Sequence, residues 1–178
     1  MHLHHISRIR SFLTDEAAAS LVRSLIFSRI DYANSLLFGL PDCLLSKLQM
    51  VQNNAARLVM RRQKSDHITP LLKHLHWLPI KYRIEYKINL ITYKALHGQA
   101  LKYITDLLDE YKPTRSLRSA SRGFLQERRA RLKRSGERAY SVCAPKLWNK
   151  LPLSVRSCGS TDSFKVALKT HLFKNAFN

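Results

Sequence analysis

Apolar residues recur at steps of three and four over most of the first hundred positions, a spacing that predicts amphipathic helices. One clear start lies at Thr14, which precedes the string DEAAASLVRSLIFSRI (15–30) and can cap a helix whose first turn contains two acidic residues. The apolar face expected for this helix consists of Ala18, Leu21, Val22, Leu25, Ile26 and Arg29.

Two longer helices follow in the same pattern. The string LLSKLQMVQNNAARLVMRR (44–62) predicts a stripe made of Leu44, Leu48, Val51, Ala55, Leu58 and Val59. The string LPIKYRIEYKINLITYKALHG (78–98) predicts a stripe made of Ile80, Ile84, Ile88, Ile91 and Ala95. Pro79 stands at the start of this helix and Gly98 just past its end, the order that helices favour. Tyr82, Tyr86 and Tyr93 flank the stripe, and their helical spacing favours core positions over stacking on nucleic-acid bases.

The composition changes at Lys112. Positions 112–138 contain ten basic residues and two acidic ones, with serines and glycines between them, which predicts a basic loop or a short hairpin around FLQERRARLKR (124–134). Helical patterns return in RAYSVCAPKLWNKL and in TDSFKVALKTHLFKNAF, where Thr161 is the expected cap. The second of these is expected to bury Phe164, Ala167, Leu168, Leu172 and Phe173. We therefore expect a mainly α-helical protein with a helical region at 1–111, a basic linker at 112–138 and a C-terminal helical region at 139–178.

The charge of the chain points to a polyanionic partner. Lys and Arg number 31 against 12 Asp and Glu, a formal net charge of +19, and such a field attracts nucleic acid at long range. Arginine and lysine displace condensed counterions from phosphates without distinguishing base sequence, so we expect non-specific backbone binding to RNA, DNA or both. The alternative is a solvated loop whose charge is incidental. The expected nucleic-acid-binding residues are Arg115, Arg118, Arg122, Arg128, Arg129, Arg131, Lys133, Arg134 and Arg138.

The sequence offers little support for catalysis, and we predict no catalytic residue, metal site or cofactor. Acidic residues are scattered, and the closest group, Asp106, Asp109 and Glu110, fits a solvated helix face better than a Mg²⁺ site. No phosphate-binding glycine motif, nucleophile elbow or HExxH string occurs. The histidines near the N-terminus lack partners at zinc-site spacing.

The remaining signals concern location. Three widely spaced cysteines indicate reduced thiols in an intracellular protein, and no apolar run approaches the ~18 residues of a membrane span. The string MHLHHISRIRSFL lacks acids and resembles a transit peptide, although its continuity with the following pattern favours a first folded helix.

Seven strings, in order along the chain, resemble the C-terminal part of reverse transcriptase polyproteins from non-LTR (LINE-type, jockey-like) retrotransposons. They are SRIDYANSLLFGLP, LQMVQNNAARLV, DHITPLLKHLHWLPIKYRI, KINLITYKALHG, RSLRS, ERAYSVCAPKLWNKLP and SFKVALKTHLF. Ala33 departs from the cysteine frequent in the first string. Trp77, Pro79, Pro145 and Trp148 match the family strings, and we interpret them as packing residues.

The resemblance implies a thumb-like helical bundle, then the Arg-rich segment and C-terminal helices, all beyond the polymerase palm. The family's palm aspartates and its endonuclease would precede this region, so no catalytic residue transfers to this chain. The implied partners are RNA and DNA and the palm of a full-length element, in a nuclear or cytoplasmic ribonucleoprotein. Two alternatives stay open: a structural or interaction remnant of a decayed element without activity, and an accessory part that completes a separate palm.

Overall fold

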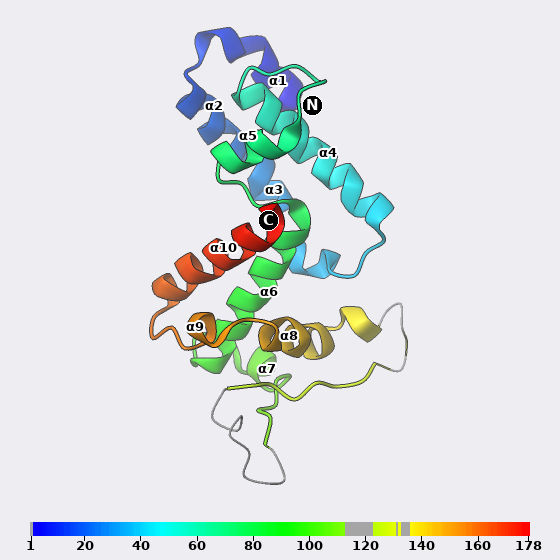
Figure 1. Cartoon of the computed structure of the whole chain (residues 1–178). Helices are drawn as coiled ribbons and strands as arrows, with labels where there is room; N and C mark the ends of the chain where they lie inside the picture. The colour runs from blue at the N-terminus through cyan, green and yellow to red at the C-terminus, as the bar shows by residue number, and fades with distance from the viewer. Residues whose placement is uncertain (1, 113–122, 131, 133–135) are drawn as a thin grey trace. The chain divides into compact units, whose positions relative to one another are not determined.

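The protein is mainly α-helical, as the hydrophobic pattern predicts (Figure 1). The computed structural model describes residues 2–112, 123–130, 132 and 136–178. Two compact units are present: the first contains Met1–Ile84 with Asn175–Asn178, and the second contains Glu85–Lys174. The division falls inside two helices, and it therefore differs from the boundaries expected at residues 111 and 138.

The first unit is built from short and medium helices. They are α1 (His2–Ile9), α2 (Asp15–Val22), α3 (Ser28–Ile30), α4 (Asp42–Val59), α5 (Ile68–His74) and the first turn of α6 (Ile80–Leu96), with 3-10 turns at Arg10–Phe12 and Asn34–Leu37. Thr14 caps α2 as predicted, because its side chain accepts a hydrogen bond from the backbone N–H of Ala17 at 3.2 Å.

A π-helical turn at Arg23–Phe27 joins α2 to α3. Here the N–H of Ser28 donates to the carbonyl of Arg23, five residues back, so the turn is wider than an α-turn. The wider turn changes which side chains face inward: Ile26 and Phe27 are buried, whereas Leu25, predicted for the apolar face, is exposed. The regular 3.6-residue pattern was wrong at this position for that reason.

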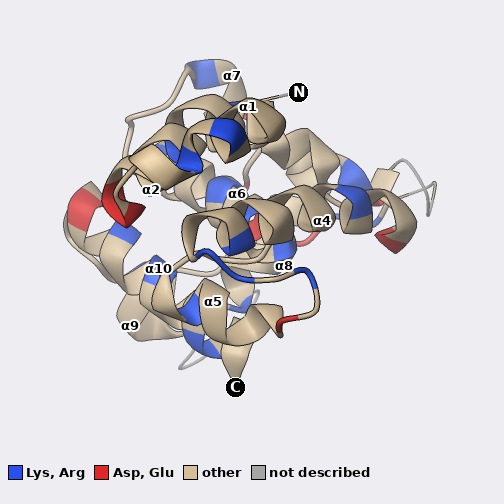
Figure 2. Ribbon diagram, turned by 90° about the horizontal axis from the view of Figure 1, so that it is seen from above, with Lys and Arg blue, Asp and Glu red and all other residues tan. Residues whose placement is uncertain are grey.

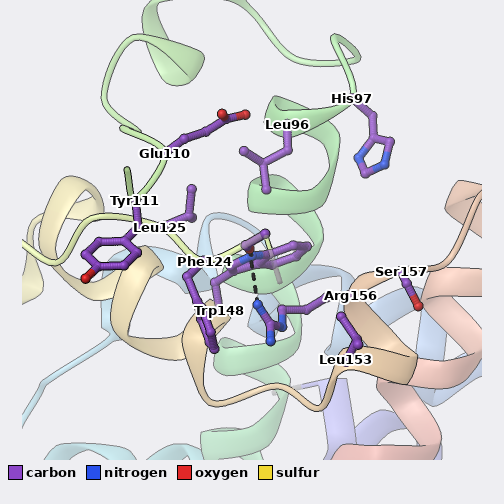
Figure 3. A pocket seen from close by; sticks show the side chains of 11 residues that line it. Leu96, His97, Glu110, Tyr111, Phe124, Leu125, Trp148, Leu153, Arg156 and Ser157 are labelled. Atoms are coloured by element: carbon purple, nitrogen blue, oxygen red, sulfur yellow. Dashed lines mark hydrogen bonds between the residues drawn. The ribbon is translucent and has the colours of Figure 1, made fainter. Parts of the chain in front are cut away.

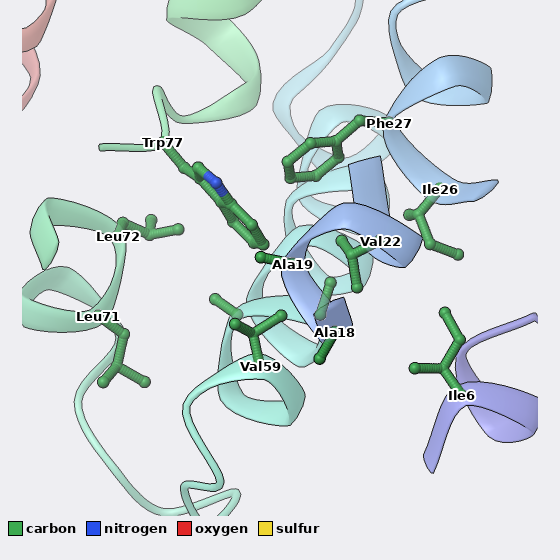
Figure 4. Packing of buried hydrophobic residues seen from close by; sticks show 12 residues of the cluster. Ile6, Ala18, Ala19, Val22, Ile26, Phe27, Val59, Leu71, Leu72 and Trp77 are labelled. Atoms are coloured by element: carbon green, nitrogen blue, oxygen red, sulfur yellow. The ribbon is translucent and has the colours of Figure 1, made fainter. Parts of the chain in front are cut away.

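The core of the first unit lies where α2 meets α4 and α5 (Figure 4). Four alanines, Ala18 and Ala19 on α2 and Ala55 and Ala56 on α4, are buried there. Their small side chains allow the helices to approach closely, while the Trp77 ring meets the Phe27 ring edge-on with centroids 4.6 Å apart. The burial of Trp77 confirms its interpretation as a packing residue.

The buried face of α4 is more polar than the sequence pattern predicts. Leu44 and Val51 are exposed, whereas Gln52 is fully buried and its amide donates to the Leu78 carbonyl at 2.8 Å. Gln49 adds a second bond, because its side-chain oxygen accepts from the N–H of Ile80 at 2.9 Å. The two glutamines thus satisfy backbone groups around the start of α6, which an apolar residue could not do.

The second unit contains the rest of α6, with α7 (Lys102–Thr105), α8 (Tyr140–Asn149), α9 (Leu153–Arg156) and most of α10 (Thr161–Phe177), whose last residues belong to the first unit. Tyr93 is buried at its centre, with its ring stacked on those of Phe164 and His97 and its hydroxyl donating to the Cys158 carbonyl at 2.7 Å. The core position favoured for Tyr93 is confirmed, and Pro145 and Trp148 are buried as predicted.

Two details of helix ends complete the comparison. Gly98 follows α6 with a φ of +68°, the left-handed conformation that glycine adopts without strain. At the start of α10 the cap is Ser160 rather than Thr161, because the Ser160 hydroxyl accepts from the N–H of Ser163 at 3.2 Å. Phe164, Leu168 and Leu172 are buried on α10 as predicted, while Ala167 and Phe173 are only half-buried.

Two weakly acidic side chains of α8, the buried Cys143 and the half-buried Tyr140, predict a loss of stability at alkaline pH. Burial raises the pKa of the Cys143 thiol from 9.0 to about 11, and it raises the pKa of Tyr140 from 10.0 to about 12. Both groups keep their protons in the folded state at pH values where the unfolded chain has lost them. Their contribution to the free energy of unfolding is therefore fully present below pH 9.0 and is lost as the pH rises above that value.

We expect Cys143→Ala to flatten the decline in melting temperature between pH 9.0 and about 11, even if its starting value is lower. Thermal melts monitored by circular dichroism at several pH values measure this. Cys43→Ala, at an exposed position, is the control and should decline as the wild type does. Parallel decline of the Cys143 variant and the wild type would contradict the assignment.

Candidate nucleic-acid interface

The segment that follows the undescribed residues 113–122 is paired with the chain that precedes them. Leu125 and Glu110 form an antiparallel bridge. The N–H of Tyr111 donates to the Phe124 carbonyl at 3.0 Å, and the N–H of Gln126 donates to the Asp109 carbonyl at 2.8 Å. The pairing therefore joins 109–111 to 124–126, and no pairing within 124–134, the predicted hairpin, occurs among its described residues.

Side chains of α8 and α9 fix the other edge of this segment. The Asn149 amide makes two bonds to Leu125, accepting from its N–H and donating to its carbonyl, both at 2.9 Å, as a neighbouring strand would. Trp148 Nε1 donates to the Gly123 carbonyl at 3.0 Å, and Arg156 donates to the same oxygen at 3.1 Å. An extended segment outside a sheet has unpaired backbone groups, and these side chains satisfy several of them.

A pocket of about 420 Å³ lies beside this segment (Figure 3). Arg156, Phe124 and Trp148 line one part of it, and Leu96, His97 and Glu110 line another. The buried Arg156 guanidinium lies 4.2 Å from the centre of the Phe124 ring and also donates to the Leu151 carbonyl. Because Arg156 is committed to these contacts, its main role is to fix the segment rather than to bind a ligand.

The predicted basic residues are only partly placed by the structure. Arg128 and Arg129 are exposed directly after the fixed stretch, and Arg128 forms an ion pair with Asp109 at 2.5 Å. Arg138 is exposed in the 3-10 turn Gly136–Arg138, just before α8. Six predicted residues lie outside the described part of the chain: Arg115, Arg118, Arg122, Arg131, Lys133 and Arg134.

Basic residues are not confined to the predicted segment. Lys and Arg occur on most helices, while Asp and Glu are sparse (Figure 2). The predicted binding residues do not include Arg61, Arg62 and Lys64, although these three cations group with Arg57 around one pocket. The signal that could have identified them is the density of cations immediately after a helix, which is also present in the predicted segment.

Potential metal ligands do not cluster in the described part of the chain. Within 2–112, 123–130, 132 and 136–178 no three or more His, Cys, Asp or Glu side chains lie close enough to hold a metal ion. No helix in that same part of the chain has the length and apolar character needed to cross a membrane. The arrangement that the structure presents is a basic, partly fixed surface segment suited to electrostatic contact.

The chain matches no protein-family model, no curated protein and no solved structure. The class that the fold and composition define is a mainly α-helical, strongly basic protein of two compact units.

Proposed function

We propose that this protein binds RNA or DNA through backbone phosphates without catalysing a reaction. We further propose that it derives from the region beyond the palm of a non-LTR retrotransposon reverse transcriptase. The observation that carries the proposal is the net charge of +19 together with exposed arginines that directly follow a fixed stretch of backbone. The second part rests on the sequence resemblance given above. The seven strings support it together and in order, whereas any one of them alone would be weak evidence.

The fixed stretch supports binding for an entropic reason. A charged segment that orders only on binding spends interaction energy on its own ordering. Here the backbone of 123–126 is already held by Asn149, Trp148 and Arg156, so Arg128 and Arg129 start from a restricted position. The ion pair to Asp109 involves two largely exposed side chains and therefore costs little to exchange for a phosphate contact.

The test is a salt titration of nucleic-acid binding. Five cations are changed to glutamine together: Arg128, Arg129, Arg131, Lys133 and Arg134. We expect the affinity for a labelled single-stranded RNA to fall at least about tenfold at low salt. We also expect a shallower log–log salt dependence, by about 0.7 to 0.9 for each phosphate no longer contacted. Fluorescence anisotropy over a range of salt concentrations measures both.

The matched control removes the same charge elsewhere. Five exposed lysines are changed to glutamine: Lys47, Lys81, Lys102, Lys150 and Lys169. If both five-residue variants lose affinity equally, the effect comes from net charge and the segment is not the site. If the wild type binds neither RNA nor DNA at low salt, nucleic-acid binding is refuted and a structural or interaction role is favoured.

Primer extension with template, dNTPs and Mg²⁺ should give no incorporation by this chain alone.

A further inference from the structure

A second basic site lies in the first unit, far along the sequence from the predicted segment. It is an open pocket of about 590 Å³ at the C-terminal end of α4. Five of its lining side chains are cationic and none is a carboxylate. The lining residues are Ser7, Arg10, Asn54, Arg57, Leu58, Arg61, Arg62 and Lys64. In Figure 2 the loop that leads from α4 to α5 is blue along much of its length.

Arg10 prepares this site without being available to a ligand. The last carbonyls of a helix repel an anion, and Arg10 neutralises them, since Nε donates to the Leu58 carbonyl at 2.9 Å and Nη2 to the Val59 carbonyl at 2.6 Å. Nη1 donates to the Leu13 carbonyl at 2.7 Å, and Nη2 also pairs with the Asp15 carboxylate. The Arg10 side chain is therefore nearly saturated.

The other cations have donors to spare. Arg57 donates from Nε and Nη2 to the Asp66 carbonyl, and Arg61 donates from Nη2 to the Leu13 carbonyl at 3.0 Å. Each guanidinium has five N–H groups, so further donors are left. Among the described residues, the Arg62 and Lys64 side chains have no hydrogen-bond or ion-pair partner. Two carboxylates lie close by: Asp15, 3.7 Å from Arg61, and Asp66, which accepts from the N–H of Gln63.

Arg61 occupies a backbone position that favours glycine. Its φ is +51°, and it is the left-handed residue that ends α4: its N–H donates to the Leu58 carbonyl, and the next N–H, that of Arg62, donates to the Arg57 carbonyl at 2.9 Å. Glycine would adopt this conformation without the strain that a side chain causes, so helix termination alone does not account for an arginine here. The residue is better explained by what its guanidinium does in the pocket.

We propose that this pocket binds phosphate groups, with Arg57, Arg61, Arg62 and Lys64 as the charged ligand-binding residues. Ser7 and Asn54 add a hydroxyl and an amide to the lining, and guanidinium forks match phosphate oxygens. Four cations exceed the charge of one phosphate group, which favours two adjacent groups. Two sources supply that chemistry, the nucleic-acid backbone and a free polyphosphate; the backbone source rests on the proposed function, whereas the anion chemistry does not.

The first experiment compares two double variants of the full chain. Arg62→Gln with Lys64→Gln removes pocket cations, and Lys47→Gln with Lys81→Gln removes the same charge at exposed positions of the same unit. The probes are a labelled oligouridylate, followed by anisotropy, and sodium pyrophosphate, followed by the rise in melting temperature. We expect only the pocket variant, and not the control, to lose RNA affinity severalfold. The slope of its log affinity against log salt concentration should be shallower by about 1 to 2.

The second experiment uses the left-handed position. Arg61→Gly removes a pocket cation and also relieves backbone strain. His76→Gly, at the end of α5, relieves strain of the same kind but leaves the pocket cations unchanged. There φ is +52°, and the N–H of Trp77 donates to the Leu72 carbonyl in the same motif. We expect neither variant to melt more than about 4 °C below the wild type. Only Arg61→Gly should weaken the response to the two probes.

The two probes distinguish the sources. Loss of RNA affinity in the pocket variants supports a backbone site. Loss of the pyrophosphate response alone supports a site for a free polyphosphate. Equal behaviour of pocket and control variants with both probes would overturn the pocket. The proposed function fails separately, if the wild type binds no nucleic acid at all while pyrophosphate still raises its melting temperature.

Discussion

Replacing Trp148 by alanine is expected to lower the free energy of unfolding of the unit 85–174 by about 3 to 5 kcal/mol. Trp148 is only 2% exposed, and its ring lies 5.9 Å from that of Phe164, measured between centroids. Truncation removes the apolar area of the indole ring and leaves a cavity that α8 and α10 can fill only in part. It also leaves the Gly123 carbonyl with one fewer donor.

Denaturant unfolding followed by circular dichroism measures the loss. Trp148→Phe separates the two contributions, because it keeps much of the apolar area and removes the bond to Gly123; we expect about 1 to 2 kcal/mol. Tyr103→Ala is the control, since this aromatic side chain in the same unit is 65% exposed and should cost under about 0.5 kcal/mol. A loss no larger for Trp148→Ala than for this control would refute the assignment of Trp148 to the core.

Replacing Arg10 by methionine is expected to destabilise the first unit by about 3 to 5 kcal/mol. The Arg10 side chain is 9% exposed and bonds three carbonyls, those of Leu13, Leu58 and Val59. Methionine is flexible and apolar and replaces the aliphatic part of the arginine side chain, but these carbonyls lose a charged donor. The cost therefore comes from buried backbone carbonyls that lose a charged donor, rather than from a cavity.

Two further variants divide this effect. Asp15→Asn should cost less than about 1 kcal/mol, because the carboxylate is 62% exposed and water replaces its partner. Arg10→Lys keeps the charge but cannot reach three carbonyls with one ammonium group, so an intermediate loss is expected. If methionine at position 10 proves as stable as arginine, the carbonyls must be satisfied by water, and Arg10 is not needed to end α4.

The candidate interface was predicted in part for a clear reason. The density of cations at 112–138 is a property of composition, so it is visible without a structure. The bonds that fix 123–126 depend on Asn149, Trp148 and Arg156, which are more than twenty residues away in the chain. The pocket at the end of α4 was missed because Arg10 and Ser7 approach Arg57 and Arg61 only when α1 meets α4.

The sequence by itself determined the helical class, the cap at Thr14, the course of α6 from Pro79 to Gly98, and the excess of positive charge. These follow from local spacing, local capping and composition, which need no distant partner. Only the tertiary structure decided that Gln52 is buried and Leu44 and Val51 exposed, and that a π-turn takes Leu25 out of the core. Burial depends on which helices meet, and backbone groups left unpaired at those meetings can require a polar side chain where periodicity predicts an apolar one.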